Sequence, residues 1–285
     1  MKASAFEYRR AESLAQAGAW LAAHEGARVI AGGQSLMAMM NMRLAAPSML
    51  IDIGDVPDLR TVAASDGVLR IGALVRHADL LRDPLVARHA PLIVRAAAHI
   101  AHPAIRNRGT IGGNLAHADP ASELPACMVA LGATLIAASP SGERAIAAEG
   151  FFRGVFETAL ARDEILTRIE VPAATTHRRF AFHELARRSG DYALAGLAAG
   201  ARADGERLRD LRLAFFGVGE TPVLARRAGA LLEAGDLSGA QAALAQDLAP
   251  QEDVHASAAL RLQLSRVLLA RCAADLCGAQ AGCQS

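Results

Sequence analysis

Two short glycine-rich segments carry the clearest chemical signal in this sequence. The first covers residues 31–36 and reads AGGQSL, and the second covers residues 109–115 and reads GTIGGNL. Paired glycines adopt positive φ readily and let a ligand approach the main chain closely. Successive amide N–H groups in such a turn form a concave site for an anion. The two segments therefore predict a phosphate or diphosphate group held by the backbone.

Each glycine segment taken alone also fits an ordinary turn. Neither contains the Gly-x-Gly-x-x-Gly fingerprint, so a Rossmann domain is not supported. The pattern gains weight because both segments occur in one chain. Ser35 stands where a helix is expected to begin, and free N–H groups and the helix dipole favour a phosphate there. Arg28, Arg106 and Arg108 are expected to supply positive charge nearby.

The composition excludes several classes of enzyme. Lys2 is the only lysine, so the chain lacks the lysine that a P-loop, a pyridoxal-phosphate enzyme or a protein kinase requires. A diphosphate held by backbone amides needs no lysine. Basic and acidic side chains number 30 and 29, and no basic stripe stands out. Nucleic acid is therefore not an expected partner.

Other residues that bear chemistry have simpler interpretations. His99, His102, His117 and Asp119 could be drawn as a metal cluster, but Pro103 interrupts the helix that would align them. We therefore expect no metal site, and Asp119 is interpreted as a turn or cap residue that shapes the second segment. No Gly-x-Ser-x-Gly elbow and no convincing general base are found, so no catalytic residue is predicted.

The sequence also bears on the compartment. The uncharged apolar run at residues 192–201 is about half as long as a membrane span requires. Residues 1–10 contain no apolar signal core. Cys127, Cys272, Cys277 and Cys283 form no Cys-x-x-Cys pair and are interpreted as free thiols. We therefore expect a cytoplasmic protein without a membrane span.

The elements that would position the two segments divide the chain into three parts. In residues 1–58 we expect strands at 6–8, 28–31 and 49–53 and helices at 11–24 and 36–44. In residues 59–172 we expect two hairpins, of 59–63 with 68–72 and of 134–138 with 144–147, and a closing strand at 164–171. Helices are expected there at 75–81, 84–100 and 121–131, and a loop at 108–120. In residues 177–285 we expect strands at 178–186, 194–202 and 209–218 and helices at 222–234, near Ala240 and at 256–276. This order predicts an α+β protein.

The chain resembles a known family in several ordered motifs. These are residues 31–36 (AGGQSL), 106–114 (RNRGTIGGN), 117–120 (HADP), 163–166 (DEIL) and 187–193 (RRSGDYA). In them the sequence is similar to the FAD-binding medium subunits of molybdenum-containing hydroxylases. That family includes the medium subunits of carbon monoxide and N-heterocycle dehydrogenases and the flavin domain of xanthine dehydrogenase.

The resemblance implies a fold and a cofactor site. The fold would be the vanillyl-alcohol-oxidase type, with two α+β subdomains around FAD and a small C-terminal α+β domain with a three-stranded antiparallel sheet. The implied FAD-binding residues are Arg28, Val29, Ile30, Ala31, Gly32, Gly33, Gln34, Ser35, Leu36, Thr110, Ile111, Gly112, Gly113, Asn114, Asp119, Glu123, Leu166 and Tyr192. Residues 32–35 would hold the diphosphate from one side and residues 110–114 from the other.

The resemblance also implies roles for three single residues. Leu166 would lie near the flavin edge, and Tyr192 would cover one face of the isoalloxazine ring. Without the resemblance, Tyr192 is equally well interpreted as a packed strand residue. Relatives often carry aspartate at the position of Glu123, which would face the ribityl chain or neighbouring amides. The glutamate keeps the charge but adds a methylene. Its alternative role is a favourable carboxylate in the first turn of a helix.

The implied function is electron transfer within a heteromeric oxidoreductase. A large subunit would carry the molybdenum cofactor and a small subunit the [2Fe-2S] clusters, together with this chain as a dimer of heterotrimers. Electrons would pass from the clusters through FAD on this chain to an external acceptor. Two alternatives remain open from the sequence: a stand-alone flavin oxidase or dehydrogenase of the same fold, and a non-enzymatic nucleotide-binding module.

Overall fold

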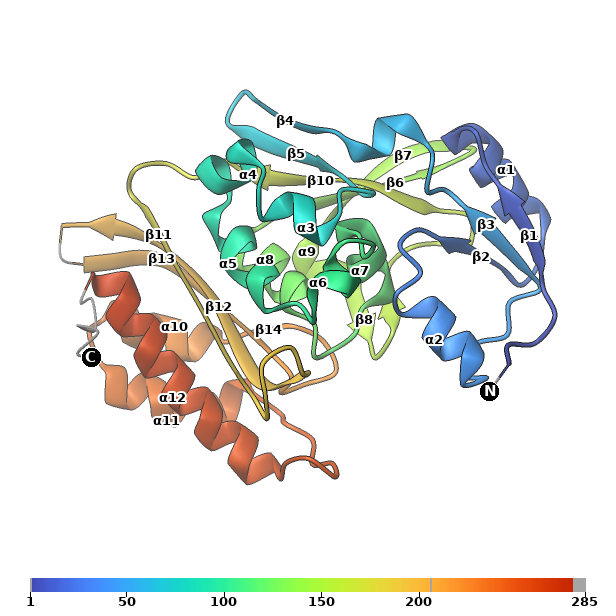
Figure 1. Cartoon of the computed structure of the whole chain (residues 1–285). Helices are drawn as coiled ribbons and strands as arrows, with labels where there is room; N and C mark the ends of the chain where they lie inside the picture. Colours follow the sequence, from blue (N-terminus) through green and yellow to red (C-terminus); the bar gives the residue numbers. More distant parts are fainter. Residues whose placement is uncertain (1, 206, 279–285) are drawn as a thin grey trace.

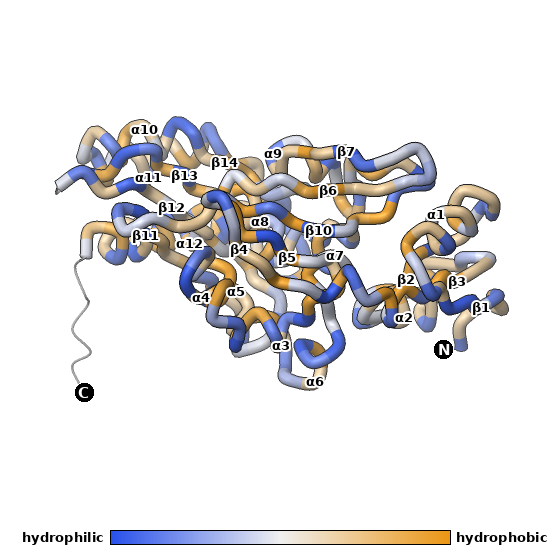
Figure 2. The backbone as a smooth tube through the Cα atoms, turned by 90° about the horizontal axis from the view of Figure 1, so that it is seen from above, coloured by the Kyte–Doolittle hydropathy of each residue, from blue (hydrophilic) through white to orange (hydrophobic). Residues whose placement is uncertain are grey.

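The computed structural model describes residues 2–205 and 207–278. Figure 1 shows three main sheets that follow one another along the molecule in the order of the chain. Figure 2, from a second direction, again places strands β1–β3 at one end and helices α10–α12 at the other. Residues 279–285, with the predicted free thiol of Cys283, lie outside the described residues. In the described part, no helix combines the length and hydropathy needed to cross a bilayer.

The N-terminal sheet has three parallel strands in the order β1-β3-β2. They are β1 (Glu7–Arg10), β2 (Ala27–Ile30) and β3 (Met49–Asp52), with helices α1 (Leu14–Ala23) and α2 (Leu36–Asn41). Ala17 and Leu21 of α1 pack on Met49 and Ile51 of β3. The predicted order of strands and helices around the first glycine segment is therefore confirmed, although α2 is shorter than predicted.

The middle sheet has five antiparallel strands in the order β4-β5-β10-β6-β7. They are β4 (Val62–Ser65), β5 (Val68–Gly72), β6 (Thr134–Ser139), β7 (Gly142–Ala147) and β10 (Ile165–Pro172). Both predicted hairpins are present. Asp66 and Gly67 turn the first one with φ values of 52° and 72°, as a tight two-residue hairpin loop requires. The predicted closing strand, β10, lies in the centre of the sheet.

Short helices accompany this sheet. They are the 3-10 helix η1 (Pro57–Arg60), α3 (His77–Leu80), α4 (Pro84–His89), α5 (Pro91–His99), α6 (Pro103–Arg106), α7 (Ile111–His117), α8 (Glu123–Leu131) and α9 (Ala148–Phe151), with a small hairpin of β8 (Phe152–Gly154) and β9 (Glu157–Thr158).

The structure corrects two expectations in this region. The predicted helix over 84–100 is two helices, because the chain leaves helical geometry at Ala90, with φ −144°, and Pro91 begins a new helix. The predicted loop over 108–120 contains α7, because the Thr110 side chain accepts a hydrogen bond from the Gly113 amide and caps a helix there. The glycine pair that suggested a loop forms part of the first turn of α7.

The C-terminal sheet has four antiparallel strands in the order β11-β12-β13-β14. They are β11 (Arg178–Ala186), β12 (Ala193–Asp204), β13 (Arg207–Phe216) and β14 (Val223–Leu224), followed by helices α10 (Arg226–Glu233), α11 (Leu237–Asp247) and α12 (Ala258–Cys277). Three strands were predicted, whereas the two-residue β14, which pairs with the end of β13, was not. Helices α5 and α8 lie between this sheet and the middle one, and α12 packs on β11 and β12 (Figure 1).

Candidate functional site

The two glycine segments lie in direct backbone contact, although they are far apart in the chain. A Cβ atom added to Gly32 would lie 2.2 Å from the carbonyl oxygen of Arg108 and 2.8 Å from the Cα of Gly109. A Cβ added to Gly113 would lie 3.8 Å from the Cβ of Ala31. The loop before α2 therefore approaches the start of α7 as closely as two main chains allow, and only glycine fits at residue 32.

The first segment presents unused backbone donors. Gly33 bends the chain with a φ of +70°, and Ser35 stands at the start of α2, as predicted, with no side-chain capping bond. In residues 2–205 and 207–278, the amides of residues 32–36 donate no hydrogen bond to the protein. The Gln34 side chain donates to the Gly32 carbonyl over 3.1 Å. This row of free N–H groups can hold an anion.

Strand β2 leads into this segment, and exposed arginines flank it. Val29 and Ile30 pair with Ile51 and Asp52 of β3, which fixes the direction in which the chain enters the turn. Ala31 and Leu36 are half-buried on either side of the turn, while Arg28 and Arg108 are exposed. Arg106, by contrast, donates to the carbonyls of Ile100 and Ala101 and is used to hold the turn between α5 and α6.

The second segment uses its amides internally. Its amide hydrogen bonds run from Ile111 to the Val75 carbonyl (2.9 Å), from Gly112 to the Ala73 carbonyl (2.8 Å), from Gly113 to the Thr110 hydroxyl (3.1 Å) and from Asn114 to the Thr110 carbonyl (3.0 Å). A Cβ on Gly112 would lie 2.4 Å from the Cβ of Ala73, so this glycine permits packing against Ala73. The four amides are therefore not available to a ligand. The second segment can contribute to the site only by forming one wall of it and by its side chains.

Asn114 carries an unsatisfied polar atom at this wall. Its side-chain amide donates to the Ser122 hydroxyl over 2.7 Å, while its Oδ1 is buried without a hydrogen-bond partner among the described residues. Buried side-chain oxygens are nearly always hydrogen-bonded in folded proteins. The orphaned oxygen of Asn114 therefore fits a ligand that brings its own donor to this place.

His77 supports the second segment and was missed by the sequence analysis. Its amide donates to the Gly109 carbonyl over 2.9 Å, and a Cβ on Gly109 would lie 2.8 Å from the imidazole ring. Burial, with a smaller contribution from the Arg106 charge, lowers the pKa of His77 to about 4, so the ring is neutral at pH 7. Nothing in the local sequence distinguishes this histidine from a surface one.

Asp119 shapes the turn after α7, as predicted. Ala118 ends α7 with a φ of 52°, and the Asp119 carboxylate then accepts a hydrogen bond from the Ala121 amide over 2.9 Å. Glu123 begins α8 and is half-buried. Burial raises the pKa of Glu123 to about 8, so this carboxyl is mainly protonated at pH 7. A protonated Glu123 differs from the charged glutamate expected from the sequence and can donate a hydrogen bond.

Tyr192 lies in the loop between β11 and β12 and is 68% exposed. The interpretation as a packed strand residue is wrong, since β12 begins at Ala193. Tyr192 lines a cleft of about 440 Å³ together with Asp119, Pro120 and Val155. Leu166 behaves differently, because its side chain is buried in the core around β10. The structure thus brings Asp119 and Tyr192 together but turns the Leu166 side chain away from solvent.

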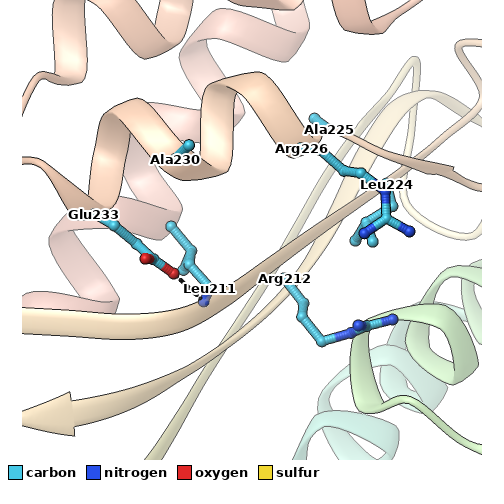
Figure 3. Close-up of a pocket in the computed structure, with 7 residues that line it drawn as sticks. All are labelled: Leu211, Arg212, Leu224, Ala225, Arg226, Ala230 and Glu233. Atoms are coloured by element: carbon cyan, nitrogen blue, oxygen red, sulfur yellow. Dashed lines mark hydrogen bonds between the residues drawn. The ribbon is translucent and has the colours of Figure 1, made fainter.

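A second cavity lies elsewhere, between β13 and α10 (Figure 3). Its volume is about 220 Å³, and its polar groups already have partners. Glu233 accepts a hydrogen bond from the Leu211 amide over 2.6 Å, and Arg212 and Arg226 both pair with Glu149. This cavity is therefore not a candidate site. The described residues contain no group of three histidine, cysteine or acidic side chains placed to hold a metal ion.

Two family models match this chain and together cover most of its length. Residues 4–174 match the family described as "FAD binding domain in molybdopterin dehydrogenase", and residues 180–276 match the "CO dehydrogenase flavoprotein C-terminal domain". The nicotine 6-hydroxylase medium subunit of Paenarthrobacter nicotinovorans is 39% identical over 276 residues, which are 95% of this chain and 97% of that one.

Solved structures give the same result. Quinoline 2-oxidoreductase from Pseudomonas putida 86 matches with a TM-score of 0.92 and 39% identity over 98% of this chain and 99% of that one. Carbon monoxide dehydrogenase from Hydrogenophaga pseudoflava matches with a TM-score of 0.94 and 34% identity over 97% of this chain and 98% of that one.

Proposed function

The chain belongs to the family of FAD-binding medium subunits of molybdenum-containing hydroxylases, and we propose that it binds FAD between its two glycine segments and transfers electrons within such an enzyme. One observation carries the assignment of the site. The amides of residues 32–36 have no partner among the described residues, and Gly32, which begins this row, lies against the backbone of Arg108 and Gly109. A diphosphate would satisfy these donors, and the exposed Arg28 and Arg108 would add charge.

The other predicted residues take narrower roles in this proposal. The wall opposite the first segment would be formed by Thr110, Ile111, Gly112 and Gly113, whose hydrogen bonds hold this wall rigid. The residues that would meet the rest of the cofactor by their side chains are Asn114 through its free oxygen, Asp119, Glu123 as a protonated carboxyl, and Tyr192 as an aromatic cover. Val29, Ile30, Ala31 and Leu36 shape the turn, and Leu166 would contribute main chain near the flavin edge.

FAD bound here would supply the chemistry of accepting electrons from [2Fe-2S] clusters of a partner and passing them to an external acceptor. The residues of this chain bind and orient the cofactor. Substrate oxidation would take place at the molybdenum cofactor of a large subunit.

The assembly would contain this chain, a large molybdenum subunit and a small iron–sulfur subunit as a dimer of heterotrimers. The solved structures that the chain matches include carbon monoxide dehydrogenases and a quinoline 2-oxidoreductase. We place the complex in the cytoplasm, with support from the described thiols of Cys127, Cys272 and Cys277, which are free. The functional division would be 1–58 and 59–172 for FAD and 177–285 for the C-terminal domain.

FAD titration of the purified full chain tests the proposal. We expect one FAD per chain and a flavin absorption spectrum, and a folded chain that binds no FAD would overturn the assignment. Gly33→Val should abolish tight binding. Gly67→Val is the matched control, because Gly33 and Gly67 have nearly the same φ, +70° and +72°, but Gly67 lies in a remote hairpin turn with nothing within 4 Å. Equal losses in both variants would contradict the site. Substrate turnover by the isolated chain would instead favour a stand-alone oxidase.

A further inference from the structure

Arg261 of α12 is a buried cation in the C-terminal part of the chain. Only 7% of the residue is exposed. Removing a guanidinium from water is costly unless its donors are paired. Arg261 is the only charged residue among the buried residues of α12, which points to a specific task.

The donors of Arg261 join three separate segments. Its Nη1 donates to the Leu194 carbonyl over 2.6 Å and to the Gly217 carbonyl over 2.8 Å. Its Nη2 donates to the Asp253 carboxylate over 2.7 Å. Asp253 in turn accepts hydrogen bonds from the amides of His255 and Ala256, which fixes its own loop. The planar fork of arginine can reach all these acceptors at once.

Two of these segments lead to the candidate FAD site. Leu194 follows Tyr192 by two residues at the start of β12. The Gly217 amide donates to the Pro120 carbonyl over 2.9 Å, next to Asp119. A Cβ on Gly217, whose φ is +71°, would lie 3.0 Å from the Ala193 carbonyl, so this turn lies tightly against the start of β12. All of these residues line the 440 Å³ cleft beside Tyr192.

We propose that Arg261 is a positioning residue that holds Tyr192 at a fixed place beside the turn at residues 119–121, so that helix α12 controls how the flavin ring is covered. This inference rests on the proposed FAD site. Arg261 itself acts through main-chain carbonyls and touches no cofactor. Without the hydrogen bonds from the Arg261 guanidinium, the start of β12 and the turn at Gly217 are both released. The loop that carries Tyr192 then moves away from the turn after α7.

Fluorescence of FAD bound to the full chain tests this inference without enzyme activity. A tyrosine against the isoalloxazine ring quenches flavin fluorescence by electron transfer, and phenylalanine does not. Tyr192→Phe therefore gives the unquenched reference. We expect Arg261→Lys to show at least half of the fluorescence increase that Tyr192→Phe shows over the wild type. The double variant Arg261→Lys/Tyr192→Phe should be no brighter than Tyr192→Phe alone. Arg266→Met is the control, because Arg266 lies on the same helix but contacts Gln241 of α11.

Several outcomes would overturn the inference. One is wild-type quenching in FAD-loaded Arg261→Lys. Another is an increase in the double variant that equals the sum of the two single ones. If Arg261→Lys does not fold or retain FAD, Asp253→Asn decides, since it weakens the same network and should also increase fluorescence; an unchanged signal there rejects the proposal. A wild-type chain that binds no FAD refutes the proposed function, whereas quenching that is insensitive to Arg261 refutes this inference alone.

Discussion

Gly32→Ala is the most direct perturbation of the contact between the two glycine segments. The added methyl would lie 2.2 Å from the Arg108 oxygen and 2.8 Å from the Gly109 Cα. Non-bonded carbon atoms rest about 3.5–4.0 Å apart, so the two backbones have to separate by roughly 1 Å. Both obstructing atoms belong to the main chain, and no side-chain rotation relieves the clash.

The size of the effect follows from two terms. Overpacking of a close contact costs about 1–3 kcal/mol of folding stability. A hydrogen bond to a charged group contributes about 1.5–3 kcal/mol, so misplacing one amide relative to a phosphate weakens binding roughly 10- to 100-fold. We therefore expect a lower melting temperature of the FAD-free chain and a clearly higher Kd for FAD.

Titration with FAD and thermal unfolding of the FAD-free chain measure the two terms separately. Gly150→Ala is the control, because a Cβ there meets nothing within 4 Å. The Kd and melting temperature of Gly33→Ala should lie between those of Gly32→Ala and Gly150→Ala. Its Cβ would lie 3.3 Å from the nearest atom, but the φ of +70° costs an alanine about 1 kcal/mol. Equal Kd values and equal melting temperatures for Gly32→Ala and Gly150→Ala would refute the close contact at Gly32.

Two further predictions concern stability. Because the pKa of Glu123 is raised to about 8, the folded chain binds this proton more tightly than the unfolded chain, and stability is lost as pH rises from about 4.5 to 8. The free energy of unfolding of Glu123→Gln should therefore rise relative to that of the wild type by on the order of a few kcal/mol between pH 5 and pH 9. Parallel pH profiles of the two proteins in urea unfolding would contradict this. Gly112→Ala should destabilise the FAD-free chain by about 1–3 kcal/mol, because its methyl meets Ala73 at 2.4 Å. Ala73→Gly should restore part of that loss in calorimetry, and the absence of any rescue would argue against the contact.

The local features of this protein were largely predictable from its sequence. Asp66 and Gly67 specify a tight hairpin by their own conformational preferences, and the structure places the turn there. The alternating strands and helices around residues 31–36 also follow from patterns within a few residues. The shortest elements, such as β14 and α6, were missed, since two to four residues carry too little pattern.

Tertiary contacts decided the chemistry of the site. The sequence treats the two glycine segments alike, yet the amides of residues 32–36 are free while those of residues 111–114 are used. The carbonyls of Val75 and Ala73 accept from Ile111 and Gly112, and Thr110 accepts from Gly113 and Asn114. Burial makes Glu123 a mainly protonated carboxyl at pH 7, a state that its residue type does not suggest. Hydrogen bonding, burial and charge depend on neighbours that arrive from distant parts of the chain. The sequence thus determined which groups are present, and only the folded structure determined which of them remain available to a ligand.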